Sequence, residues 1–340
     1  MGTYDIIDDR CVFWTGVTEI EDNLFSENGD FSEVVFPETL KRIGKNAFED
    51  CYRLKSVKIP ASVTEIGAGA FSGCRLTEII VDSRNKKYKS ISKACLTKDG
   101  RTLVFGCRAS TIPEMVETIG ESAFFYCGLD SVIIIPSSVI KIERFAFAGN
   151  ISITSIILPD SLETIGEKAF YGCMEMSSIV IPGSVNTIGK EAFEGCSKLK
   201  DLDIKNGVKK IEESAFSNCP ITAVKFPAGI SIGAFAFSGC EGLASIELPA
   251  DIVSIGKHAF GDCRINTISL PSGGPGMYGW LVTAFDNGAF SGCGIDNDAI
   301  KLVSKDFLVN GEINLKVPKA NISEYQLHPF FKEFKSVQPL

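Results

Sequence analysis

The sequence predicts an α/β repeat solenoid in which stacked coils place their strands side by side in a parallel sheet. Each copy carries a short alternation of polar and β-branched residues that ends at a proline, which is typical of a strand. One copy alone cannot bury its inward apolar side chains, so the copies must stack. A phenylalanine marks eleven copies, most of them 23 residues apart: Phe25, Phe48, Phe71, Phe124, Phe147, Phe170, Phe193, Phe216, Phe237, Phe260 and Phe290.

Composition excludes several classes of protein. Hydrophobic residues make up 45% and charged residues 22%, so the chain can bury a large core and is not disordered. A net charge of −8 without a long run of Lys or Arg argues against a nucleic-acid partner. No apolar stretch approaches the roughly 18 residues of a membrane span. The first residues have neither a basic region nor an apolar core, so we expect no signal peptide there.

The array has a cap and an interruption in its first half. Residues 1–16 precede the periodic pattern and form an expected N-terminal cap, in which Val12, Phe13 and Trp14 cover the open end of the first coil. The solenoid is expected over residues 17–314. Residues 82–112 break the period and are interpreted as an irregular repeat with a hairpin, because Asp99-Gly100 lies between two apolar runs.

The second half predicts an insertion and a second cap. Residues 272–285 are rich in glycine and contain Tyr278 and Trp280. Residues 315–340 are interpreted as a capping strand and a helix, which would begin at Ser323.

One copy, residues 162–182, shows how a coil is expected to fold. Ile179 and Ile181 alternate with Val180, so the first two face the core and Val180 faces outward. Pro182 ends the strand because proline cannot donate to the sheet. Gly189 then allows a tight bend, and a positive φ is favoured at this position.

The repeat resembles the BspA-like leucine-rich-repeat family. Residues 182–204, PGSVNTIGKEAFEGCSKLKDLDI, match its pattern almost position by position. Residues 85–91 (NKKYKSI) and 97–104 (TKDGRTLV) are similar to its irregular repeat, and residues 317–325 (VPKANISEY) to its terminal cap. The resemblance implies a right-handed horseshoe with a parallel β-sheet on the concave face and short helical turns on the convex side. It also implies secreted or surface-attached proteins, some of which bind host extracellular-matrix proteins, and no shared catalytic residues.

The twelve cysteines predict buried free thiols. Nine of them follow the repeat phenylalanine by three residues, and Asn150 fills this position once. Stacked copies carry these side chains in parallel, too far apart at Cβ for a good disulfide, and no CxxC pair suggests a metal site. A disulfide between Cys95 and Cys107 across the hairpin remains an alternative.

The sequence offers little for catalysis. Residues 274–279, GPGMYG, fit GxGxxG, but a proline interrupts them and no helix pattern follows. The two histidines, His258 and His328, have no nucleophile nearby in sequence. We therefore expect no catalytic, cofactor-binding or metal-binding residues.

Candidate partner-binding residues come from the outward strand positions. These are largely apolar in the first half of the array and polar in the second. Exposed apolar rows commonly mark a partner surface, although β-branched residues suit strands wherever they occur. The candidates are Val35, Ile80, Ile133, Ile157 and Val180, joined by Tyr278 and Trp280 of the insertion.

The sequence thus predicts a non-catalytic protein-interaction module, an adhesin-like protein that binds host or neighbouring-cell proteins through its concave face. The alternative is a structural protein that associates with itself as a homodimer, and an enzyme with its site in the insertion ranks third. We expect a cell-surface or secreted location, with a cytoplasmic one as the alternative.

Overall fold

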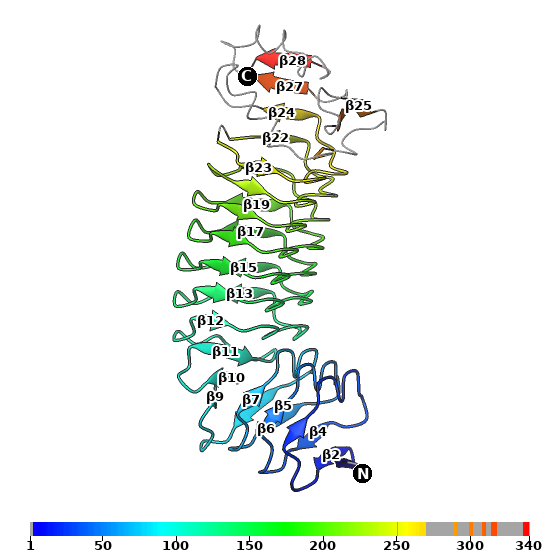
Figure 1. The fold of residues 1–340 in the computed structure, drawn as a ribbon, viewed down its shortest axis with the longest axis vertical. Helices are drawn as coiled ribbons and strands as arrows, with labels where there is room; N and C mark the ends of the chain where they lie inside the picture. The colour runs from blue at the N-terminus through cyan, green and yellow to red at the C-terminus, as the bar shows by residue number, and fades with distance from the viewer. Residues whose placement is uncertain are drawn as a thin grey trace. The chain divides into compact units, whose positions relative to one another are not determined.

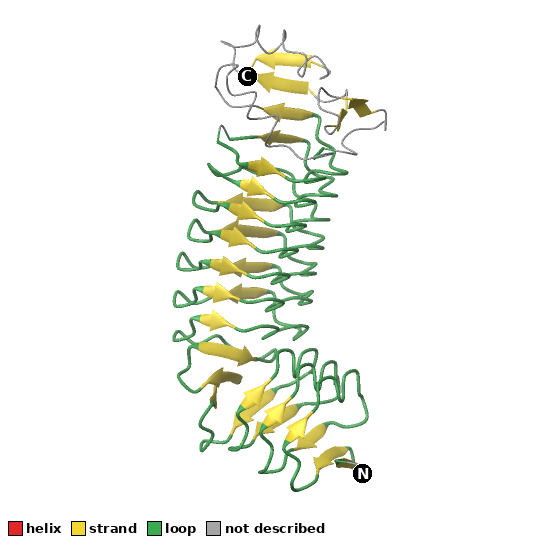
Figure 2. Cartoon of the chain, in the orientation of Figure 1, coloured by secondary structure: helices red, strands yellow, loops and turns green. Residues whose placement is uncertain are grey.

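The computed structural model describes residues 3–249, 251–269, 289–290, 299–301, 308–310, 314–317 and 336–339. The chain divides into two compact units, Met1–Leu162 and Glu163–Leu340. Each unit is a repeat β-solenoid whose coils are made of strands and turns (Figure 2). Most regular coils contribute a long strand, which usually ends one or two residues before the repeat proline, and most add a short strand of two residues before the repeat glycine.

The prediction of short helical turns on the convex side is wrong for the described residues, which contain no helix. The segment after each short strand forms consecutive turns instead. Lys168 (φ 53°) and Gly172 (φ 66°) adopt left-handed conformations, which interrupt a right-handed helix. The amide of Phe170 donates to the carbonyl of Ala192 in the next coil at 2.8 Å. Bonds between coils therefore replace the bonds that a helix would make within one coil.

Unit 1 begins with an antiparallel hairpin and continues as parallel coils (Figure 1). Its first long-strand sheet has the order β1 (Tyr4–Ile7), β2 (Arg10–Phe13), β4 (Glu33–Val35), β6 (Ser56–Ile59) and β8 (Glu78–Val81). The short strands β3 (Glu19–Ile20), β5 (Arg42–Ile43) and β7 (Glu65–Ile66) form a second, parallel sheet. In the N-terminal hairpin Phe13 is buried, whereas Trp14 is exposed and donates from Nε1 to Asp5.

The irregular repeat of unit 1 is built from three antiparallel strands, β9 (Tyr88–Ile91), β10 (Ala94–Thr97) and β11 (Thr102–Phe105). β11 then pairs in parallel with the short strand β12 (Thr118–Ile119), which pairs with β14 (Lys141–Ile142). The long strand β13 (Val132–Ile134) pairs with β15 (Ser155–Ile157).

Unit 2 repeats the two-sheet arrangement. Its short strands are β16 (Thr164–Ile165), β18 (Thr187–Ile188), β20 (Lys210–Ile211), β21 (Ser231–Ile232) and β23 (Ser254–Ile255). The long strands are β17 (Ser178–Ile181) and β19 (Asp201–Ile204), then β22 (Ser245–Glu247), β24 (Thr267–Ser269), β27 (Asn314–Val317) and β28 (Ser336–Pro339), with neighbours parallel. A separate antiparallel pair is formed by β25 (Ala299–Lys301) and β26 (Leu308–Asn310).

A column of stacked phenylalanines forms the centre of each core. In unit 2 the rings of Phe193 and Phe216 lie 5.1 Å apart with an interplanar angle of 5°. In unit 1 Phe105 of the irregular repeat continues the column, because its ring lies 4.8 Å from that of Phe71. The 53-residue interval between Phe71 and Phe124 therefore holds one additional coil.

The repeat glycine has a different role from the expected one. Gly189 does not have a positive φ. A Cβ built on it would lie 2.5 Å from the carbonyl carbon of Gly166 in the preceding coil. Glycine is thus favoured there because two backbones approach closely.

The residues predicted at the far end lie mostly outside the described part of the chain. This applies to the insertion at 272–285 with Tyr278 and Trp280, and to the capping helix expected from Ser323. Only the strands β27 and β28 of the expected C-terminal cap are described.

Candidate functional site

The outward side chains of the long strands form the predicted row. Ile80 and Ile157 in unit 1 are exposed, and Val35 is half-buried. In unit 2 Val180 is exposed, but the strand beside it places Asp203 in register with it, and Lys205 pairs with that carboxylate at 2.6 Å. The apolar row in unit 2 therefore ends at Val180, because the next strand carries a charged residue at the same position.

The placement of Ile133 on this outward row is wrong. Ile133 pairs in register with Ile156, which is buried, and its own side chain is half-buried. Val132 and Ile134 are the outward residues of β13, and Ile134 lies in register with Ile157. Val132, Ile134 and Ile157, which are 55%, 68% and 53% exposed, form a continuous apolar surface, named here the β13–β15 patch.

β13 is an edge strand of its sheet. Its partner β15 bonds to the backbone of Ser131 and Ile135, so the alternation of a parallel strand turns the N–H groups of Val132 and Ile134 toward the open edge. The segment that precedes Pro113 in the irregular repeat would normally cover this edge. Instead, Ser110 Oγ donates to the carbonyl of Lys93 at 2.6 Å, which ties that segment to the hairpin.

A groove of about 420 Å³ runs beside this edge. Thr111 and Ile112 line it, together with the buried rings of Phe124 and Phe147. An open strand edge next to a groove with apolar and charged lining residues is a surface that other polypeptides can use for pairing.

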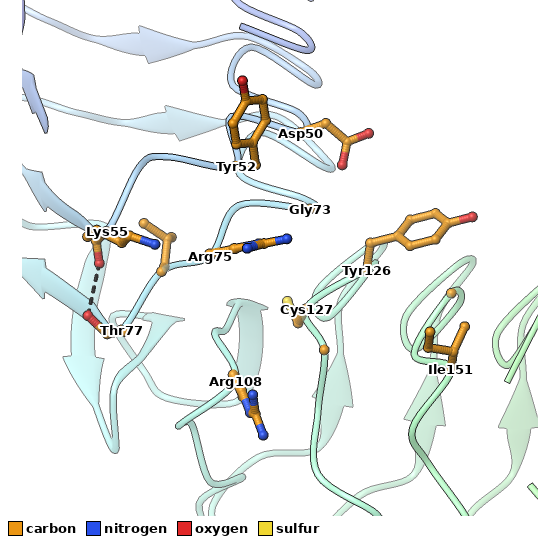
Figure 3. Close-up of a pocket in the computed structure, with 13 residues that line it drawn as sticks. Asp50, Tyr52, Lys55, Gly73, Arg75, Thr77, Arg108, Tyr126, Cys127 and Ile151 are labelled. Carbon is orange, nitrogen blue, oxygen red and sulfur yellow. Dashed lines mark hydrogen bonds between the residues drawn. The ribbon is translucent and has the colours of Figure 1, made fainter. Parts of the chain in front are cut away.

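A second and larger cleft, of about 750 Å³, lies on the turn side of unit 1 (Figure 3). Turns of four coils and the loop at Arg108 contribute to it. Arg75 extends from the turn of Gly73 toward the turn that carries Tyr126 (Figure 3). Tyr52 and Tyr126 are both exposed and come from different coils.

The cleft carries charges that the fold does not use. Arg108 pairs with Asp130 at 3.1 Å, but Arg75 and Lys55 make no ion pair with any described residue. Asp50 also lines the cleft. Desolvation by burial, and then the charge of Glu27, raise the pKa of the Asp50 carboxyl.

The cysteine ladder is structural. Eleven cysteines are described; all are free, and ten of them are buried. Cys95 and Cys107 are among the free ones, so the bridge left open between them is not formed. A ladder thiol donates to the carbonyl of the repeat phenylalanine one coil earlier, as Cys219 does to Phe193 at 3.1 Å. Desolvation raises the pKa of Cys95 well above the ordinary range.

The remaining motifs considered for metal binding, catalysis or membrane insertion give no candidate site among the described residues. Over the described residues, no group of three or more His, Cys, Asp and Glu side chains could hold a metal ion. His258 stacks on Phe235 with ring centroids 5.2 Å apart. His328 and the GPGMYG segment lie outside the described part. No described segment is a helix of a length and apolarity suited to crossing a membrane.

Sequence reasoning missed the two features that lie at the irregular repeat. Ile134 could have been found by counting back two residues from Pro136, as Ile157 is found from Pro159. The cleft had a weaker signal in the sequence, namely a shortened turn after Phe105. In a regular coil the interval from the repeat phenylalanine to the third residue before the proline is nine residues, as from Phe170 to Ile179. In the irregular repeat the same interval, from Phe105 to Ser110, is five residues.

Comparisons with known proteins agree with this architecture. A leucine-rich repeat protein from Eubacterium ventriosum is 24% identical, with a TM-score of 0.67 over 76% of this chain and 77% of its own. A leucine rich cell surface protein from Faecalibacterium prausnitzii is 27% identical, with a TM-score of 0.52 over 80% of this chain and 62% of its own. The pneumococcal vaccine antigen PcpA is 18% identical, with a TM-score of 0.51 over 95% of this chain and 71% of its own.

No curated protein matches the sequence significantly. The BspA type leucine rich repeat region, by contrast, matches in six copies over residues 18–134, 117–232 and 213–294. This match covers most of the chain and confirms the resemblance drawn from residues 182–204. The chain belongs to the BspA-type leucine-rich-repeat family.

Proposed function

We propose that this protein is a non-catalytic binding module that recognises another protein through the β13–β15 patch. The observation that carries the proposal is the exposure of Val132, Ile134 and Ile157, each more than half exposed on adjacent strands. β-branched side chains in neighbouring outward positions form a flat apolar surface without a structural partner in unit 1. Contiguous exposed apolar surface of this kind commonly marks an interaction site.

The strand edge adds a second contribution to the same surface. A partner that covers the patch can also bond to the N–H groups of Val132 and Ile134, which face the open edge of β13. Main-chain bonds of this type supply affinity, and the groove beside them supplies selectivity for side chains. Ile80 on β8 and Val35 on β4 are further candidate contacts on the other long-strand sheet of unit 1, and Val180 is a candidate contact in unit 2.

The test replaces Ile134 and Ile157 with lysine and measures binding to a panel of purified extracellular-matrix proteins by biolayer interferometry. Both side chains are mostly exposed, so the double variant should fold normally. We expect at least a tenfold loss of affinity, about 1.4 kcal/mol, because buried apolar anchors dominate interface energy. Val253→Lys is the matched control, since Val253 is 56% exposed but lies in unit 2. Unchanged affinity of the double variant, or an equal loss in the control, would contradict the proposal.

Self-association is the second candidate function and uses the same patch. The open edge of β13 favours it, because an edge strand can pair with an identical edge. Light scattering after size-exclusion chromatography distinguishes the two. A doubled mass that returns to 36.7 kDa in the Ile134→Lys, Ile157→Lys variant supports the homodimer.

We further propose a cell-surface or secreted location with an adhesin role. The family assignment and the cell-surface protein among the similar structures support this location. The thiols are compatible with an oxidising environment. Buried thiols with raised pKa values stay protonated, and the thiol form resists oxidation. Immunolabelling of intact source cells tests the location, and signal found only after permeabilisation would favour the cytoplasmic alternative.

A further inference from the structure

The large cleft of unit 1 arises from a deletion in the periodic pattern. In a regular coil the chain needs nine residues to pass from Phe170 to Ile179. The irregular coil passes from Phe105 to Ser110 in five. With those turn residues absent, the turn of Gly73 meets the turn of Tyr126 directly, and the amide of Gly73 donates to the carbonyl of Phe125 at 3.0 Å. A cleft of about 750 Å³, a volume typical of small-ligand sites, lies beside this contact and is lined by both turns.

Arg75 is the unusual charge of this cleft. The chain has nine arginines, and the structure describes all of them. Eight form ion pairs with described carboxylates, and Arg75 alone does not. Lys55, on the same lining, is also without a carboxylate partner among the described residues. In a chain of net charge −8 these two free cations would attract an anionic group.

The other lining groups favour a ligand that also carries hydrogen-bond donors and an apolar face. The carboxylate of Asp50 accepts no hydrogen bond from a described side chain, and its pKa is raised by desolvation and then by Glu27. Donors from a ligand would stabilise it. The rings of Tyr52 and Tyr126 provide exposed apolar faces. The Tyr126 ring is held over Gly149, where a Cβ would lie 2.5 Å from its Cε1 atom.

We propose that this cleft binds an acidic saccharide, a sugar that carries a carboxylate or sulfate group. Its acidic group would pair with Arg75, whose guanidinium can form two parallel hydrogen bonds to a carboxylate or sulfate. Its hydroxyl groups would donate to Asp50, and an apolar face of a sugar ring would cover a tyrosine ring. This site shares none of its residues with the β13–β15 patch, so the inference does not depend on the proposed protein partner.

Two other ligand classes fit the lining less well. An acidic peptide brings further carboxylates that Asp50 would repel, and it lacks the array of hydroxyl donors that a saccharide offers. A nucleic acid needs many cations along its backbone, and the cleft offers Arg75, Lys55 and the already paired Arg108.

The test is isothermal titration calorimetry of the full chain with two probes, a heparin-derived tetrasaccharide and 3′-sialyllactose. The first carries sulfates and carboxylates, and the second a single carboxylate, so the pair identifies which acidic group is recognised. Arg75→Gln should weaken binding at least about tenfold, because a hydrogen-bonded charge is lost. Arg264→Gln is the matched control, since Arg264 is an exposed arginine of unit 2. Higher salt should weaken binding of either probe.

Several outcomes would overturn the inference. One is that neither probe binds, and another is that Arg264→Gln weakens binding as much as Arg75→Gln. A third is that hexaglutamate, titrated in parallel, binds more tightly than both saccharides. The Ile134→Lys, Ile157→Lys variant should bind the saccharide normally, so a failure of this site and a failure of the protein-binding patch are distinguishable.

Discussion

Asn85 is expected to hold the irregular repeat in place, and replacing it tests how the array tolerates its interruption. Its side chain is buried and saturated with four backbone hydrogen bonds. Nδ2 donates to the carbonyls of Pro60 and Val63 at 2.8 and 2.9 Å. Oδ1 accepts from the amides of Lys87 and Tyr88, both at 2.8 Å. One amide group thus joins the third coil to the start of β9.

The cost of Asn85→Ala follows from these four bonds. The substitution leaves two carbonyls and two amides without their partner, and each unsatisfied buried group costs about 1–3 kcal/mol. Water can reach part of the space, so we expect a total near the lower end, about 3–5 kcal/mol. That is a large fraction of the roughly 5–15 kcal/mol that stabilises a domain. Asn28→Ala is the control, because Asn28 bonds only to Asp30 in an exposed turn and should cost less than about 0.5 kcal/mol.

Urea denaturation followed by circular dichroism measures the change, and hydrogen exchange with mass spectrometry locates it. A repeat array can unfold in stages, so the exchange data are needed to assign the loss to residues 82–112. Protection should fall first in β9 and β10. A destabilisation below about 1 kcal/mol, or one spread evenly along the chain, would refute the idea that Asn85 anchors the irregular repeat.

Three further predictions concern the core. Phe193→Ala should destabilise unit 2 by about 3–5 kcal/mol in the same urea experiment, and Phe235→Ala, at an exposed ring, by much less. Asn150→Ala should cost about 2–4 kcal/mol and Asn150→Cys less, because a thiol there keeps one of the three side-chain hydrogen bonds; equal costs would contradict this. Ten of the twelve thiols should stay unmodified by Ellman's reagent at pH 8 until urea is added, because they are buried and desolvation raises the pKa of Cys11, for example, to about 12; modification of most thiols in the native protein would count against it.

The regular part of the fold was predictable because one interaction repeats at one spacing. The 23-residue interval between Phe170 and Phe193 requires that their rings occupy the same place in successive coils, and they stack 5.0 Å apart. The same reasoning gave the buried cysteine ladder and its substitution by Asn150, whose Nδ2 donates to Phe124 in the direction that a ladder thiol uses. Periodicity determines position without knowledge of the detailed backbone path.

Periodicity did not determine local conformation, and the errors lie there. Val132 to Ile135 are four β-branched residues in a row, so polar and apolar alternation gives no register for β13. The expected helical turns failed for a related reason. The left-handed residues, such as Lys168 and Glu191, are ordinary polar side chains that carry no signal for their conformation. The short strands, such as Thr187–Ile188, are too brief to show a pattern of their own.

Both proposed sites of unit 1 follow from one irregularity in an otherwise regular array. Where coils match, each backbone group and each inward side chain meets its equivalent in the next coil, and little remains available for a ligand. The irregular repeat removes turn residues after Phe105, which opens the cleft at Arg75. Its Ser110 bonds to the hairpin rather than lying along β13, which leaves the edge beside Ile134 unpaired. In regular coils such charges and strand edges are paired with the neighbouring coil. The irregular repeat leaves them exposed, and both proposed binding sites therefore lie beside it.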